Sequence, residues 1–234
     1  MKRLPRTVIT EETLKQYLGV ETERLNLEHH YWIKDNFIDK IGRMSPNLIE
    51  LSVRRLKISN RAFSEIVLHL KKLERIDASD CPNISSTSLK ILLDNNKSLS
   101  QVQLANNPGA VIDEIVIRLS HLENLSFLDI SFANQVTDHG LNSFKDKNFP
   151  ITKLFINGLT GVSANGVADL VGTCLHTLKV FEAALMNQES MNSGFCNALS
   201  HAFHLEELDL TGDLHIGDEG ISALSKGAIP LENN

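Results

Sequence analysis

The sequence has few of the features that mark secreted and membrane proteins. It contains three cysteines, one tryptophan and two tyrosines in 234 residues. An odd number of cysteines without paired spacing argues against a disulfide framework and favours a reducing compartment. No apolar run approaches the length of a membrane span, and the first residues lead into polar sequence instead of a signal peptide. We therefore expect a cytoplasmic protein without membrane insertion.

An excess of basic residues and the common catalytic motifs are also missing. Lys and Arg number 23 against 29 Asp and Glu, and the net charge of −6 argues against nucleic acid as a partner. We find no Gly-rich phosphate loop, serine elbow or Cys/His pair at a working spacing. His29 and His30, and His201 and His204 near Cys196, are interpreted as packing residues. The sequence predicts no catalytic residue, cofactor or metal ligand.

What the sequence does contain is a repeated unit, clearest between Leu125 and Phe144. Its first part alternates apolar and polar residues as a short strand does, with Leu128 and Ile130 on one face. Its second part opens a helix, for which Thr137 or Asp138 is a suitable cap. Alone, such a strand–turn–helix unit cannot bury its apolar side, and the rest of the chain supplies copies of it.

The copies number eight and follow one another at intervals of 25–27 residues. Each has apolar residues three and five positions after its start, and the helical half recurs at 84–89, 162–167 and 216–221. The units start at Thr22, Leu48, Leu73, Leu99, Leu125, Ile151, Leu178 and Leu205.

This pattern resembles the leucine-rich repeat, L-x-x-L-x-L-x-x-N/C followed by a helix. More narrowly it is similar to the cysteine-containing subfamily, C-x-x-I-T-D-x-G-L, of the F-box/leucine-rich-repeat proteins. The resemblance implies an α/β leucine-rich-repeat solenoid (horseshoe), with a parallel sheet on the concave face and helices on the convex face. The Asn/Cys position holds Cys81 and Asn107, and elsewhere it holds His30, Leu56, Ala133, Leu159, Met186 and Asp213. Where neither Asn nor Cys is present we expect looser turns, with other groups or water taking the backbone bonds.

The two ends differ from the regular repeats. Residues 1–21 resemble the helical half of a repeat with no strand before it, which predicts an N-terminal cap helix or a partial repeat. Residues 22–234 form the array of about eight units, and Pro230-Leu231 falls where a further strand would begin. Because neither end carries a polar capping repeat, we expect either a longer parent protein or a neighbouring subunit that covers the ends.

The predicted concave face carries an aromatic patch near the middle of the array. Non-leucine strand positions are exposed on that face, and exposed aromatic residues on a sheet commonly mark a contact surface. The predicted partner-binding residues are Phe127, Phe132, Phe155, Val180, Asp129 and Lys153. The alternative is that the phenylalanines cover one another or a terminal tail.

Two functions agree with these observations. The first is a non-enzymatic scaffold or structural subunit of a larger assembly, for which a cytoskeletal or ciliary setting is implied by resemblance only. The second is the substrate-recognition part of an F-box/leucine-rich-repeat ubiquitin-ligase receptor. Leu4-Pro5 superficially resembles an F-box opening, but repeat-like sequence begins at Thr10 and leaves no room for that domain. A GTPase-activating module like the Ran activator fits less well, because its repeats are longer and its arginine loop has no match here.

Overall fold

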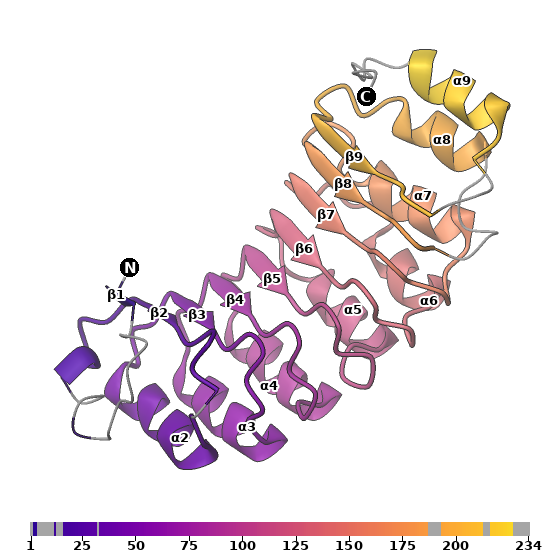
Figure 1. Ribbon diagram of the computed structural model, residues 1–234. Helices are drawn as coiled ribbons and strands as arrows, with labels where there is room; N and C mark the ends of the chain where they lie inside the picture. Colours follow the sequence, from indigo (N-terminus) through magenta and orange to yellow (C-terminus); the bar gives the residue numbers. More distant parts are fainter. Residues whose placement is uncertain are drawn as a thin grey trace. The chain divides into compact units, whose positions relative to one another are not determined.

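The computed structural model describes residues 2–3, 12, 16–31, 33–186, 193–212 and 216–226. The chain forms two compact units, 1–110 and 111–234, called unit 1 and unit 2 below. Both consist of strands of two or three residues that alternate with helices along the chain (Figure 1).

In unit 1 each strand pairs in parallel with the next one along the chain, and the helices lie on one side of the strands (Figure 1). The elements are β1 (Lys2–Arg3), β2 (Arg24–Asn26), α2 (Asp35–Met44), β3 (Glu50–Ser52), α3 (Asn60–His69), β4 (Arg75–Asp77), α4 (Ser86–Asn95) and β5 (Gln101–Gln103).

Unit 2 has the same parallel order of strands with helices on one side. Its elements are α5 (Asp113–Leu119), β6 (Phe127–Asp129), α6 (Asp138–Leu141), the 3-10 helix η1 (Asn142–Phe144), β7 (Lys153–Phe155), α7 (Ala164–Gly172), β8 (Val180–Glu182), α8 (Ser193–Leu199), β9 (Glu207–Asp209) and α9 (Asp218–Lys226). Among the described residues, no helix is both long and apolar enough to span a bilayer.

The first strand was not expected. Lys2 and Arg3 pair in parallel with Leu25 and Asn26, so the expectation that no strand precedes the first helical segment is wrong. The sequence could not predict this strand, because two charged residues show no alternation of apolar and polar side chains. The strand is recognised only from its backbone pairing with β2. Most of the segment predicted as a cap helix within residues 1–21 lies outside the described residues.

The core follows the predicted columns. The middle residue of each three-residue strand points toward the helices, and its equivalents in neighbouring strands are in register. Seven of these residues are at most 1% exposed: Leu25, Leu51, Ile76, Val102, Leu128, Leu154 and Phe181. The equivalent residue in β9, Leu208, is only half-buried.

The turn after each strand has one geometry in every repeat. The residue seven positions after the unit start adopts a positive φ of 57° to 84°: His29, Arg55, Asp80, Asn106, Phe132, Gly158, Leu185 and Gly212. The N–H of Arg55, Asp80, Phe132, Gly158 and Leu185 donates to the next turn, as from Arg55 to the Ser79 carbonyl at 3.0 Å. The expectation of looser turns is therefore wrong at Leu56, Ala133, Leu159 and Met186, because backbone bonds between successive turns hold those turns in the common geometry. Asp213 lies outside the described residues.

The helix starts explain the T-D-x-G part of the motif. In unit 2, Asp138 Oδ1 accepts a hydrogen bond from the Ser163 N–H that precedes α7, at 2.8 Å. A Cβ on Gly166 would clash with that same carboxylate. The cap of α7 is Ser163, whose Oγ accepts from the Gly166 N–H at 3.3 Å. Asp138 therefore positions this cap residue, and the glycine leaves room for the carboxylate.

Candidate protein-binding surface

The face of each sheet that the helices leave uncovered is called its open face. Strand register places equivalent residues of successive strands side by side in rows along it. In unit 2 the first row is Phe127, Lys153, Val180 and Glu207, and the second row is Asp129, Phe155, Glu182 and Asp209.

The open face of unit 1 is occupied by ion pairs between its own strands. Glu50 lies between Arg24 at 3.8 Å and Arg75 at 3.1 Å. At the ends of the strands, Arg54 lies within 3.7 Å of Glu28 and 3.5 Å of Asp80. Opposite charges in register stabilise neighbouring strands and neutralise this surface.

The open face of unit 2 is aromatic where unit 1 is charged. The rings of Phe127 and Phe155 meet edge to face, with centroids 5.1 Å apart. Each ring is half-buried, so the two cover one another in part and still present apolar surface to solvent. Lys153, paired with Phe127, is exposed. Asp129, paired with Phe155, accepts a hydrogen bond from the Ser131 N–H at 3.0 Å.

One of the predicted residues is less exposed than expected. Val180 is only 6% exposed, so its predicted exposure is wrong. In the sheet it is flanked by Lys153 and Glu207, whose long aliphatic stems can cover a valine. Phe132 is 41% exposed but belongs to the turn after β6, where its ring packs over Gly158.

Leu185 is an exposed apolar residue that sequence reasoning missed. It is 57% exposed, has a φ of 58°, and its side chain lies over Gly212 as that of Phe132 lies over Gly158. The sequence did contain a signal for this exposure. A bulky residue stands seven positions after the unit start, and the same position of the next repeat is glycine. Large side chains in this backbone region are uncommon and often occur at functional sites.

The cysteines offer no activated nucleophile. All three are buried as free thiols. Burial raises the pKa of Cys81 and of Cys174 to about 12, and it also raises the pKa of Cys196. A thiol with a raised pKa stays protonated at neutral pH and reacts slowly.

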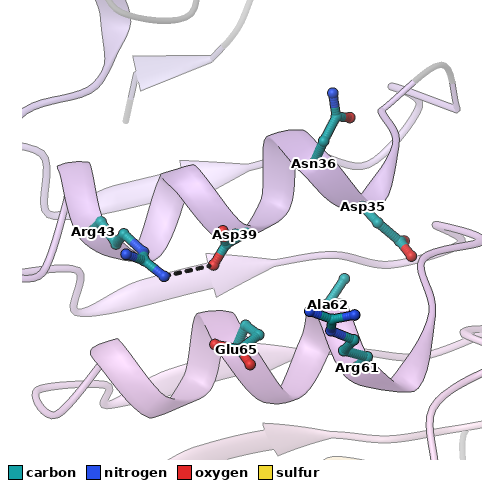
Figure 2. A pocket seen from close by; sticks show the side chains of 7 residues that line it. All are labelled: Asp35, Asn36, Asp39, Arg43, Arg61, Ala62 and Glu65. Carbon is teal, nitrogen blue, oxygen red and sulfur yellow. Dashed lines mark ion pairs between the residues drawn. The ribbon is translucent and has the colours of Figure 1, made fainter.

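A second group of polar side chains lies in a depression between α2 and α3 (Figure 2). Asp39, Glu65 and His69 offer ligand-type atoms within 4.8 Å of one another, which no sequence spacing indicated. Arg43 lies 3.6 Å from Asp39, as the dashed line in Figure 2 shows, and already compensates its charge. The side chains are partly exposed, so we assign no metal to this group.

Comparison with solved structures identifies the type of fold. A chain of the crystal structure of the Rad7 and Elc1 complex in yeast matches with a TM-score of 0.54 and 17% identity, over 89% of this chain and 67% of that one. An internalin (inlF) from Listeria monocytogenes matches with a TM-score of 0.62 and 14% identity, over 92% of this chain and 62% of that one. The fold is a leucine-rich-repeat solenoid.

At these identities the likeness concerns the fold alone, and the chain spans about three fifths of the internalin. No protein-family model matches the sequence. Membership of the cysteine-containing subfamily stays a prediction, although the cap-positioning aspartate and its glycine give that motif a structural reason here.

Proposed function

We propose that this chain is a non-enzymatic protein–protein interaction module that binds its partner through the open face of unit 2. The observation that carries the proposal is the edge-to-face pair of Phe127 and Phe155 on a face that none of the described helices covers. Half-buried aromatic rings on a rigid sheet give a partner a large apolar contact at little cost in side-chain entropy. The described cysteines, protonated and buried, point away from covalent chemistry.

We propose that the chain is a scaffold or structural subunit of a larger complex in the cytoplasm. This complex could belong to the cytoskeleton or to a cilium. The half-burial of Leu208 supports a further contact at the β9 end, because its equivalents in the other strands are fully buried. A neighbouring subunit that covered this side chain would bury more apolar surface.

The second candidate is the substrate-recognition part of an F-box/leucine-rich-repeat ubiquitin-ligase receptor. It is favoured by the T-D-x-G motif, in which Asp138 and Gly166 have the cap-positioning and spacing roles described above. The solved structure of Rad7 with Elc1 further shows a similar fold in a complex with a second protein.

Affinity capture from the cells of origin, followed by mass spectrometry, tests the proposal. The Phe127→Asp/Phe155→Asp double variant is compared with Phe203→Asp, which alters a 59% exposed aromatic residue outside the open face. Circular dichroism checks that both variants fold. We expect a fixed set of structural subunits that the double variant loses and the control retains.

Two results would count against parts of this proposal. Recovery of a cullin and the adaptor that binds F-boxes would favour the receptor over the scaffold. If the same subunits survived in the double variant, the open face of unit 2 would not be the binding surface.

A further inference from the structure

Beside the aromatic pair, the open face of unit 2 carries a group of acidic side chains. Glu182 on β8 and Asp209 on β9 are paired directly in the sheet register, and Glu207 is paired with Val180 one row away. Neighbouring strands lie about 4.8 Å apart, so like charges in register repel one another. These three side chains are called the acidic triad.

Lys153 lies in the same row as Glu207, but Val180 separates the two, and the described residues show no ion pair to any member of the triad. Glu182 accepts a hydrogen bond from Asn157 Nδ2 at 3.0 Å, and Asp209 accepts one from the Thr211 N–H at 2.9 Å. Both donors are neutral. The bonds from Thr211 lower the pKa of Asp209, which keeps this carboxylate ionised.

Unit 1 shows a different arrangement in its first row, the row to which Glu207 belongs in unit 2. There Glu50 is flanked in register by Arg24 and Arg75, and both arginines pair with it. The first row is therefore neutralised in unit 1, whereas Glu207 in the first row of unit 2 has no arginine beside it in the sheet register. A partner that binds unit 2 can supply the cation that unit 1 provides for itself.

The aromatic neighbour decides which kind of cation fits. Phe155 is paired with Glu182 in the sheet and lies in the same row as the triad's two directly opposed carboxylates. A hard metal ion prefers an all-oxygen shell, whereas a lysine or arginine side chain combines a cation with an aliphatic stem. Such a side chain can contact a ring and a carboxylate together.

We propose that the open face of unit 2 binds a basic segment of a protein partner. A lysine or arginine of that segment pairs with Glu182 and Asp209, and an apolar neighbour packs on Phe127 and Phe155. This inference rests on the proposed function and names the chemistry of the partner.

A phage-displayed library of random dodecapeptides, selected on the full chain, tests the partner chemistry without assuming a sequence. We expect the enriched peptides to combine lysine or arginine with an adjacent aromatic or aliphatic residue. Glu207→Lys should weaken binding of the enriched peptides about tenfold by reversing a charge of the triad. Glu182→Gln keeps the acceptor for Asn157, removes one charge, and should weaken binding by less.

The matched control is Glu123→Lys, which makes the same change of net charge at an exposed position outside the strands. Equal weakening by Glu207→Lys and Glu123→Lys would show a response to net charge alone and would overturn the inference. Failure to enrich any peptide would overturn it as well.

The outcomes separate this inference from the proposed function. Enriched peptides without basic residues, lost in the Phe127→Asp/Phe155→Asp variant, would refute the basic segment and leave the binding surface standing. Basic peptides that bind this double variant as well as the unaltered chain would refute the placement on the aromatic pair.

Discussion

At the scale of single residues, Asn107 shows how a buried side chain fixes a turn. It is 2% exposed; its Oδ1 accepts from the Cys81 N–H at 3.0 Å, and its Nδ2 donates to the Ala78 carbonyl at 2.8 Å. Asn96, which is 1% exposed, braces the Leu73 N–H and the Leu70 carbonyl in the same way. The motif identified the first asparagine, and only the structure identified the second.

Asn107→Ala should lower the free energy of unfolding by about 3 kcal/mol, because it leaves several buried backbone groups without partners. Asn83→Ala is the matched control, since Asn83 is exposed and makes one bond of 3.3 Å to the Lys57 carbonyl. Urea denaturation followed by circular dichroism measures both. Equal small losses in the two variants would contradict the bracing role.

Two aspartates at equivalent row positions should respond to pH in opposite ways. Asp77 and Asp209 each accept a backbone bond two residues on, from Ser79 and Thr211. Burial raises the pKa of Asp77 from its ordinary 3.8, whereas the bonds from Thr211 lower the pKa of the more exposed Asp209. A raised carboxyl pKa means that the fold loses stability as pH rises through that pKa. A lowered pKa means that stability is lost as pH falls through it.

Asp77→Asn should therefore raise the midpoint of thermal unfolding at neutral pH and change little at pH values below the ordinary pKa of 3.8. Asp209→Asn should lower the midpoint slightly at neutral pH. Both asparagines keep the acceptor for the backbone N–H. Thermal unfolding followed across this pH range checks the two signs, and the same sign in both variants would refute the account.

At the scale of elements, the strands were predictable from sequence and the turns were not. The apolar columns repeat every 25–27 residues, so the register of Leu128 with Leu154 was predictable before any coordinates. The exposure of Val180 depends on Lys153 and Glu207, each 27 residues away in the sequence. A local sequence pattern cannot show which distant residues lie beside a given strand position. Leu185 adopts a backbone conformation that its own residue type disfavours, because contacts between repeats override propensity.

At the start of α7, we expect a glycine-to-alanine change to lower the free energy of unfolding, although alanine has the higher helix propensity. Gly166→Ala should destabilise the protein by about 1–2 kcal/mol, since its Cβ would displace the carboxylate of Asp138 that holds Ser163, the N-cap of this helix. Gly172→Ala in the same helix meets nothing within 4 Å. Propensity should make that change neutral or stabilising by up to about 1 kcal/mol. Urea denaturation of both variants decides, and a stabilising Gly166→Ala would refute the capping arrangement.

At the scale of the whole molecule, the two units differ in what their open faces present. Unit 1 pairs its own charges there, as Glu50 does with Arg24 and Arg75. Unit 2 presents Phe127 and Phe155 beside the acidic triad. The sequence predicted the aromatic pair because the repeat fixes which strand positions are exposed. It did not predict the separation of charge, because pairing across strands follows from side-chain geometry and not from composition.

The most direct test of the central claim is photo-crosslinking in the cells of origin, with benzoylphenylalanine introduced in place of Phe155. The same probe in place of Phe203, an exposed aromatic residue outside the open face, is the control. The account predicts a discrete crosslinked protein from position 155 and none from position 203. A crosslinked partner from position 203 with none from position 155 would contradict binding through the open face of unit 2.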